Sequence, residues 1–264
     1  MTENVTPPDH RSEATAAYVL ENPAAPGPFL VICEHASNAF PAPWGDLGLD
    51  AGAQRAHIAW DPGALGLARG LAGALGAPLI AGAASRLIYD LNRPPQSPGA
   101  MAAKSEIYSI PGNAALTPEA RAARTEALYV PFHARLRALI AERLARGERP
   151  VLVTVHSFTP VYNGQHRAVE FGVIHDADPR LAQAVQAEAE ARSGLLTQLN
   201  APYSAADEVT HTLALQATPM GLHNVMLEIR NDLIDSPEAE AAMAARLAPI
   251  LRAALHDLTA QEAR

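Results

Sequence analysis

Four apolar segments of the sequence each end in polar side chains that could do chemistry. These side chains are carboxylates, imidazoles, an amide and guanidinium groups, namely Glu34, His35, Asp90, Asn92, Arg93, His156, Glu228 and Arg230. Buried apolar strands have no structural need to end in such groups, and the carboxyl ends of parallel strands meet at the sheet edge where ligands bind. The sequence therefore predicts a polar site at that edge.

The histidines and carboxylates predict a metal site. Imidazole and carboxylate ligands without thiolates suit Zn²⁺, which in hydrolases takes three protein ligands and leaves one position open. His35 and His156 would supply two ligands for one zinc ion per chain, and the third could be Asp61, Asn38 or Glu34. Because an amide is a poor ligand for zinc, we favour Asp61 over Asn38.

Hydrolysis at such a site also needs a carboxylate that takes a proton from the attacking water and passes it to the leaving amine. Glu228 is the candidate, and its alternative role is a structural salt bridge with Arg230. Arg86, Arg93 and Arg230 could bind a substrate carboxylate or stabilise a developing oxyanion. The tetrad Asp90-Leu-Asn-Arg93 could form a turn that an Asp–Arg ion pair fixes, or it could bind a small anion. We favour anion binding, with Asp90 orienting Arg93 or its loop.

Other candidate chemistries fit the sequence less well. His57 lies four residues before Asp61 and is expected to support the site or the core rather than to bind metal. Cys33 lies within an apolar run, where a thiol is usually buried and inert. Ser157 lacks the glycine-flanked elbow of a hydrolase nucleophile, and no glycine spacing matches a phosphate-binding loop.

Predicted strands, which are apolar runs, alternate along the chain with predicted helices, and these elements must position the polar groups. Strands are predicted over 28–33, 78–83, 87–89, 151–155, 170–174 and 221–229, and helices over 65–75, 117–144, 179–192 and 237–258. Pro131 should kink or split the second helix. The strands are apolar on both faces, which indicates an α/β fold with a mostly parallel, mixed sheet flanked by helices. Residues 1–27 are expected to form a loose arm or a short edge element, followed by a single domain over 28–264.

Composition limits the function further. The chain has 264 residues, of which 48% are apolar, and a formal net charge of −8, so one core is expected and a nucleic-acid partner is not. Cys33 is the single cysteine, which excludes an intrachain disulfide and a thiolate zinc cluster. Since no stretch resembles a signal peptide or a membrane span, we expect a soluble, cytoplasmic monomer or homodimer without a membrane partner.

In their order and spacing, several segments resemble the N-formylglutamate amidohydrolase family over about residues 28–234. The segments that carry the resemblance are Cys33–Asn38, Trp60-Asp61, Ser85–Arg93, Ile110–Asn113, His156–Pro160, Asn200–Tyr203 and Glu228–Ile234. This family is similar to zinc carboxypeptidases and aspartoacylases. The resemblance therefore implies a zinc-carboxypeptidase-like α/β fold with a metal at the carboxyl edge of its sheet.

The resemblance also implies an activity, which is hydrolysis of the N-acyl amide of an acidic amino acid. For N-formyl-L-glutamate the products would be formate and glutamate. Asn92 and Arg93 match residues that hold the substrate carboxylate, and Arg86 matches an arginine that polarises the scissile carbonyl. His35 and His156 map to the zinc histidines, and Glu228 to the carboxylate that activates water. We expect four further residues to contact this small anionic substrate, namely Arg230, Ser157, Asn200 and Tyr203.

Two positions depart from the pattern of the similar families. Asn38 stands where the carboxypeptidase pattern has glutamate, and Gln216 stands near a position where related chains have histidine. Both departures bear on metal and substrate affinity more than on the fold. The alternatives are a deacylase or carboxypeptidase for another small amide, and a non-catalytic protein that binds an anionic metabolite.

Overall fold

An eight-stranded mixed sheet forms the centre of the protein, whose computed structural model describes residues 13–263. Four neighbouring strands are parallel to one another, and the next strand on either side runs antiparallel to them. In spatial order the strands are β1 (Glu13–Ala14), β2 (Tyr18–Glu21), β4 (Leu79–Gly82), β3 (Phe29–Cys33), β7 (Val151–Phe158), β12 (Asn224–Arg230), β10 (Phe171–Ile174) and β11 (Thr197–Leu199). The mostly parallel, mixed sheet expected from the sequence is confirmed.

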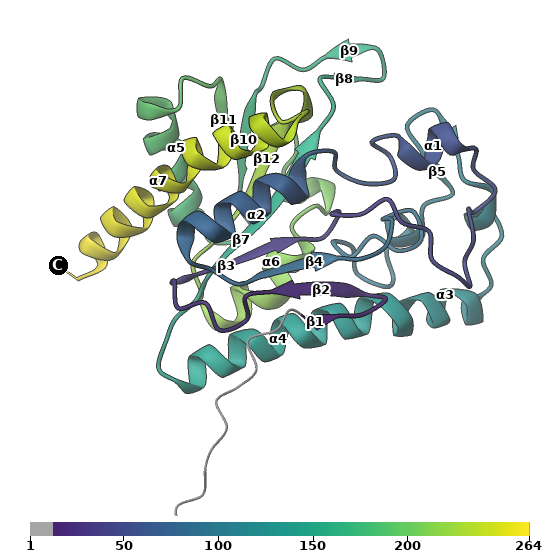
Figure 1. The fold of residues 1–264 in the computed structure, drawn as a ribbon, viewed down its shortest axis with the longest axis horizontal. Coiled ribbons are helices and arrows are strands. Elements are labelled where there is room, and N and C mark those ends of the chain that lie inside the picture. Colours follow the sequence, from purple (N-terminus) through teal and green to yellow (C-terminus); the bar gives the residue numbers. More distant parts are fainter. Residues whose placement is uncertain (1–12, 264) are drawn as a thin grey trace, which may run out of the picture.

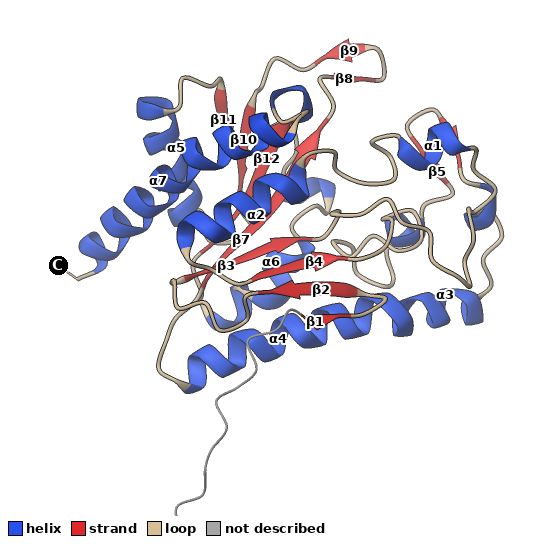
Figure 2. Ribbon diagram, viewed as in Figure 1, coloured by secondary structure: helices blue, strands red, loops and turns tan. Residues whose placement is uncertain are grey.

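Helices cover both faces of this sheet (Figures 1 and 2). They are α1 (Ala51–Arg55), α2 (Ala64–Leu75), α3 (Pro118–Arg124), α4 (Val130–Ala145), α5 (Arg180–Arg192), α6 (His211–Gln216) and α7 (Pro237–Glu262). Single 3₁₀ turns occupy Pro98–Met101, Pro111–Asn113, Ala205–Asp207, Thr218–Met220 and Asn231–Leu233. Within residues 13–263, no helix combines the length and apolarity that a membrane span requires.

Alternation along the buried strands divides the core into two layers. Val31 and Cys33 of β3 pack in one cluster with side chains of α2, α5 and α7. Leu30 and Ile32 point to the opposite face and pack with side chains of α4 and α6. Because side chains alternate across a strand, a strand between two helical layers must be apolar at every position. This is why the central strands read as uninterrupted apolar runs.

The N-terminal segment adds an edge to the sheet over the residues that the structure describes. β2 pairs antiparallel with β4, with Leu20 opposite Ile80, and β1 folds back on β2. Residues 13–21 therefore form the short edge element that was one of the two expectations for 1–27. Residues 1–12 of the expected arm lie outside the described range.

The prediction of a strand over 87–89 is wrong. This segment follows β4 as a buried turn and loop and joins no strand of the sheet, in which β2 and β3 are the neighbours of β4. Side chains from elsewhere satisfy its backbone, since Asn113 donates to the Leu87 carbonyl at 2.8 Å and Arg124 to the Ile88 carbonyl at 3.1 Å. Burial made the segment apolar, and its backbone bonds to side chains and, through the Ile88 N–H, to the Ser85 carbonyl at 3.0 Å rather than to a neighbouring strand.

The helix predicted over 117–144 is interrupted. Thr117 caps α3 by accepting a hydrogen bond from the Ala120 backbone N–H at 3.2 Å, as its sequence indicates. A π-helical turn then spans Thr125–Tyr129, and α4 begins at Val130 with Pro131 in its first turn. Where the sequence predicts a kink or a split, the chain stays helical and makes a π-helical turn just before Pro131, because a proline lacks the N–H that a regular α-helix would need there.

Two small hairpins stand apart from the main sheet. One pairs β5 (Lys104–Ser105) with β6 (Tyr108–Ser109), and the other pairs β8 (Val161–Tyr162) with β9 (Gln165–His166). They lie toward the same end of the molecule as α1 (Figure 1). The Glu106 carboxylate accepts a hydrogen bond from the Asn163 backbone N–H at 3.1 Å, so the tips of the two hairpins are joined.

Candidate metal centre and active site

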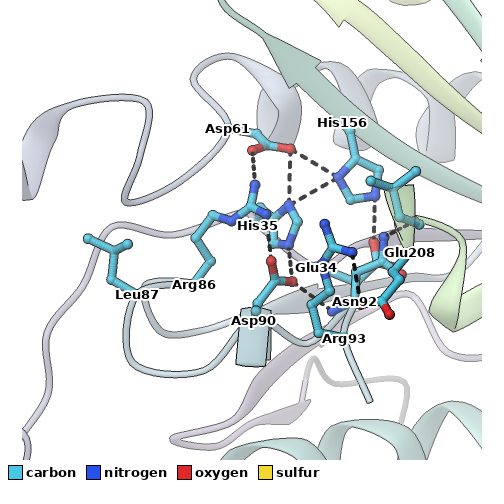
Figure 3. Close-up of polar contacts among 12 residues, drawn as sticks. Glu34, His35, Asp61, Arg86, Leu87, Asp90, Asn92, Arg93, His156 and Glu208 are labelled. Carbon is cyan, nitrogen blue, oxygen red and sulfur yellow. Dashed lines mark hydrogen bonds and ion pairs between the residues drawn. The ribbon is translucent and has the colours of Figure 1, made fainter. Parts of the chain in front are cut away.

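Three buried side chains converge at the carboxyl ends of the central strands. His35 follows β3, His156 lies in β7, and Asp61 comes from the loop before α2. Asp61 Oδ2 lies 3.3 Å from His35 Nδ1 and 3.0 Å from His156 Nδ1, and the two Nδ1 atoms are 3.2 Å apart (Figure 3). Ligand atoms about 2.0–2.1 Å from a tetrahedral zinc ion stand about 3.3 Å from one another. This group could therefore bind a metal ion.

Each histidine also has a carboxylate near its other ring nitrogen, Nε2. His35 Nε2 lies 2.6 Å from Asp90 Oδ1, and His156 Nε2 lies 3.2 Å from Glu34 Oε2. A carboxylate at Nε2 fixes the proton on that nitrogen and leaves Nδ1 free as a ligand, which is the usual support of metal-binding histidines. The donor set thus fits zinc. Glu34, one of the three candidates for the third ligand, supports His156 instead.

The charges of these supporting carboxylates are maintained by their neighbours. Burial raises the pKa of Asp90, but the charges of Arg86 and His35 outweigh burial and hold it well below its ordinary value. Burial likewise raises the pKa of Glu34, and the positive charge of His156 brings it below the ordinary value. Both carboxylates therefore stay ionised and able to accept from Nε2–H.

Backbone contacts hold Asp61 in place. The Asp61 N–H donates to the His35 carbonyl at 2.9 Å, which ties the loop before α2 to the end of β3. The Ser157 N–H donates to Asp61 Oδ2 at 3.3 Å, and the Ser157 hydroxyl donates to the Pro62 carbonyl at 2.7 Å. Ser157 lines the cavity, and its polar groups position the Asp61 segment.

Glu228 lies beside this group on the neighbouring strand. It is the register partner of His156 in the parallel pair β7–β12, so the two side chains share one face of the sheet. The Glu228 side chain is buried, and its Oε2 has no hydrogen-bond partner among residues 13–263. Burial raises the pKa of Glu228 to about 7. A carboxylate with such a pKa is suited to accept and release a proton near neutrality.

A cavity of about 630 Å³ opens onto these groups. Arg86 lines it and bridges two carboxylates, with Nη2 2.5 Å from Asp90 Oδ2 and Nη1 3.4 Å from Asp61 Oδ1. Asp90 thus orients His35 and Arg86 rather than Arg93, and its Oδ1 also accepts from the Asn92 N–H at 3.0 Å, so it supports its own loop as the sequence suggested. His57 also lines the cavity, where its Nε2 lies 2.9 Å from a Glu106 carboxylate oxygen.

Asn92 and Arg93 line the cavity, but much of their hydrogen-bonding capacity is already used. Asn92 Nδ2 donates to the Val209 carbonyl, and Asn92 Oδ1 accepts from the Thr212 N–H at 2.9 Å. Arg93 Nη1 donates to the Asp207 carbonyl and lies 3.7 Å from Glu208 Oε2 (Figure 3). Both residues therefore hold the segment 207–212 beside the cavity as well as facing into it.

Two predicted substrate-binding residues lie outside the cavity lining, which corrects the sequence interpretation. Asn200 hydrogen-bonds His175, with its Nδ2 2.9 Å from the ring Nε2. Arg230 pairs with Asp232 at 2.8 Å and with Glu170 at 3.4 Å. Its guanidinium faces these carboxylates at the end of β12 and not the cavity. The salt bridge weighed between Glu228 and Arg230 does not form.

Two positions that depart from the family pattern also lie away from the metal group. Asn38 donates to the Gln54 carbonyl at 3.3 Å and is absent from the cavity lining. Gln216 is buried against His133, with its Nε2 3.2 Å from the His133 carbonyl oxygen. Cys33 is fully buried, and burial raises the pKa of its thiol well above the ordinary value, so the thiol is inert as expected.

Sequence reasoning missed Arg167, which lines the cavity. Its guanidinium carbon lies 4.5 Å from the ring centre of Tyr162 and 4.9 Å from that of Tyr203. Of the predicted residues, Tyr203 also lines the cavity, and its pKa is raised to about 12, first by burial and then by the charge of Glu228. The sequence signal for Arg167 was weak, since it follows an exposed hairpin and no apolar strand.

Comparisons with known proteins agree with this architecture. A crystal structure of a gene product from Agrobacterium tumefaciens is 53% identical, with a TM-score of 0.90, over 92% of this chain and 96% of that one. The crystal structure of an N-formylglutamate amidohydrolase from Ralstonia eutropha is 19% identical, with a TM-score of 0.65, over 92% and 98% of the two chains, and this likeness shows the fold alone. No curated protein sequence matches the chain. The family description "N-formylglutamate amidohydrolase" matches residues 27–235. The chain therefore belongs to the N-formylglutamate amidohydrolase family and is an amidohydrolase.

Proposed function

We propose that this protein is a zinc-dependent amidohydrolase that cleaves the N-acyl bond of an acidic amino acid, with N-formyl-L-glutamate as the first substrate to test. The observation that carries the proposal is the buried triangle of His35, Asp61 and His156 beside Glu228, whose Oε2 has no hydrogen-bond partner within the described range 13–263. A metal group and an adjacent base are the two parts that hydrolysis of an amide requires.

His35, Asp61 and His156 would hold the zinc ion through Nδ1, Oδ2 and Nδ1. When bound there, zinc would supply Lewis acidity that polarises a carbonyl group and lowers the pKa of water. Glu228 accepts a proton from the attacking water as the new carbon–oxygen bond forms. It then passes that proton to the amide nitrogen as the carbon–nitrogen bond breaks, which gives the carboxylic acid (formic acid for a formyl group) and the free amino acid.

Arg86 would donate to the carbonyl oxygen of the substrate as negative charge develops on it. The side chain is 28% exposed and lines the cavity, so one side of the guanidinium is free to face a ligand. Its ion pairs with Asp90 and Asp61 fix its orientation before the substrate arrives. Charged donors that are preoriented in this way stabilise an oxyanion more than mobile ones do.

The cavity fits a small anionic substrate. Four cationic side chains line it, namely Arg86, Arg93, Lys104 and Arg167, and they could pair with the carboxylates of such a substrate. A volume of about 630 Å³ lies within the range of small-molecule sites, about 300–1,000 Å³. We infer that Arg93 binds a carboxylate of the N-acyl amino acid, as the resemblance implies, while its contact with Asp207 fixes its position.

The test is the release of amino acid from N-formyl-, N-acetyl- and N-succinyl-glutamate and -aspartate, measured with the zinc content of the protein. Glu228→Gln should retain about one zinc per chain and lose about 10²- to 10⁴-fold in kcat, since it removes the base and no ligand. Glu126→Gln, an exposed glutamate in the π-helical turn, is the matched control and should keep full activity.

Three outcomes would contradict separate parts of the proposal. Full activity after complete removal of metal by a chelator would exclude zinc dependence. Unchanged turnover in zinc-loaded Glu228→Gln would exclude this carboxylate as the base. Failure to hydrolyse any of the N-acyl acidic amino acids, with zinc bound, would exclude the proposed substrate class.

A further inference from the structure

We propose that Arg167 binds the side-chain carboxylate of the substrate and so selects N-acyl derivatives of acidic amino acids over those of neutral ones. This inference rests on the proposed function for the identity of the substrate. It concerns a residue that directly follows β9 and lines the same cavity, on a different segment from the metal group and from the loop that carries Arg86 and Arg93.

Aromatic side chains orient the guanidinium of Arg167, and they leave its positive charge uncompensated. It lies among three aromatic rings, with its central carbon 4.5 Å from the ring centre of Tyr162, 4.9 Å from that of Tyr203 and 5.6 Å from that of Phe158. Stacking on aromatic faces orients a guanidinium while its N–H groups, which lie in its plane, stay available for a planar anion.

One of these N–H groups lacks a partner. Arg167 Nη1 is buried and makes no hydrogen bond with any of residues 13–263. Buried polar groups in folded proteins are nearly always hydrogen-bonded, and a charged one is especially unfavourable when left unpaired. A carboxylate that enters the cavity would complete this bond.

The other two arginines that line the cavity already have carboxylate neighbours. Arg86 is bridged by Asp90 and Asp61, and Arg93 lies near Glu208 and donates to the Asp207 carbonyl. Arg167 has no carboxylate within ion-pair distance over the described part of the chain. Of the three cavity arginines, Arg167 is therefore the one whose positive charge is most available to a second carboxylate of the substrate.

The hairpin is braced so that Arg167 keeps this position. The Arg167 N–H donates to the Pro160 carbonyl at 2.8 Å, and Arg230 Nη1 lies 3.4 Å from the Arg167 carbonyl oxygen. At the tip of the hairpin, the Asn163 N–H donates to Glu106. Arg230, which the sequence assigned to substrate binding, would thus act as a positioning residue for Arg167.

A pair of substrates that differ only in charge tests the proposal. N-formyl-L-glutamate and N-formyl-L-glutamine have nearly the same size, and only the first carries a side-chain carboxylate. Arg167→Met should lower kcat/KM for the glutamate derivative about 10- to 100-fold, mainly through KM, because a hydrogen bond between charged groups is lost. The glutamine derivative should change by less than about twofold, so the preference for glutamate should disappear.

Two further variants separate binding from folding. Arg167→Lys keeps the charge but loses the planar fork, and it should retain part of the preference for glutamate. Arg146→Met, at an exposed position that follows α4, is the matched control and should behave as the wild type. An equal loss on both substrates in folded Arg167→Met protein would overturn the proposal and show that the arginine has a structural role.

A binding measurement makes the assignment independent of turnover. Glutarate should bind the zinc-loaded wild-type protein more tightly than pentanoate in calorimetry, and Arg167→Met should remove this difference. If no N-acyl amino acid is hydrolysed but the glutarate preference and its loss are observed, the proposed function fails and the assignment of Arg167 stands. A wild-type protein that does not prefer glutarate to pentanoate would overturn the assignment.

Discussion

At the scale of single residues, the site consists of side chains that could bind a metal ion and that are each oriented by a neighbour. His35 and His156 both direct Nδ1 toward Asp61, and each has a carboxylate at Nε2. Asp90 supports both a metal-facing histidine and Arg86, so one carboxylate links the metal group to the group that would stabilise the oxyanion. This double contact explains why Asp90 is buried and ionised rather than exposed in a turn.

Asp90→Asn should weaken zinc binding about 10- to 100-fold, because supporting hydrogen bonds to metal-binding histidines typically contribute this much. The amide can no longer accept from His35 with full charge, and it also loses the ion pair with Arg86. Zinc affinity is measured by competition with a chromophoric chelator. Asp257→Asn, on the exposed side of α7, is the control, and an affinity equal to that of the wild type in both variants would refute the support role.

At the scale of elements, the site depends on a loop that has no neighbouring strand. The segment 85–93 carries Arg86, Asp90, Asn92 and Arg93, and its backbone is held by loop hydrogen bonds, such as the one from the Asp90 N–H to the Ala100 carbonyl at 2.8 Å, and by side chains. Arg124, at the end of α3, donates to the Ile88 carbonyl at 3.1 Å, to Asn113 Oδ1 at 2.7 Å and to the Gly112 carbonyl at 3.3 Å. One buried arginine outside the cavity lining therefore fixes the loop that lines it.

Arg124→Met should lower the free energy of unfolding by about 3 kcal/mol, because it leaves at least two buried acceptors without a donor. The loss is measured by urea denaturation of the metal-free protein. Zinc affinity should fall as well, since Asp90 lies two residues after Ile88. Arg246→Met, at an exposed position on α7, should change the free energy of unfolding by less than about 0.5 kcal/mol. Equal stabilities of the two variants would show that Arg124 does not hold the loop.

At the scale of the whole molecule, the metal group joins segments that are far apart in the sequence. His35 is separated from Asp61 by 26 residues and from His156 by 121. The group assembles only when β3 and β7 pair in parallel and the loop before α2 folds onto their ends. A metal that binds the folded group but not the unfolded chain must therefore stabilise the entire fold.

Zinc should raise the thermal midpoint of the metal-free protein in a concentration-dependent way. Linkage predicts a stabilisation of about 4 kcal/mol when free zinc exceeds its dissociation constant 1,000-fold. Differential scanning calorimetry with and without zinc measures the shift, and magnesium serves as the control cation. His156→Ala should abolish the shift. The same shift in this variant would place the stabilising zinc elsewhere.

The sequence by itself determined the strand and helix pattern and most of the residues that meet at the cavity. Apolar runs without alternation required a sheet covered on both faces, and polar residues that follow such runs had to gather at its carboxyl edge. Nine of the predicted site residues line the cavity, namely His35, Asp61, Arg86, Asn92, Arg93, His156, Ser157, Tyr203 and Glu228. Local pattern is sufficient for His35, His156 and Glu228, because strand direction brings the ends of the parallel strands β3, β7 and β12 to one edge. Asp61, Arg86, Asn92, Arg93 and Tyr203 come from loops, which strand direction does not place.

Only the tertiary structure decided what each side chain contacts. Asp61 rather than Glu34 or Asn38 faces the two histidines, because the loop before α2 folds back onto the end of β3. The segment 87–89 is a buried loop because distant side chains, those of Asn113 and Arg124, bond its carbonyl groups, and no local run encodes these contacts. Hydrogen-bond partners such as Asp90 for His35 depend on contacts across 55 residues, and spacing along the chain carries no information about them.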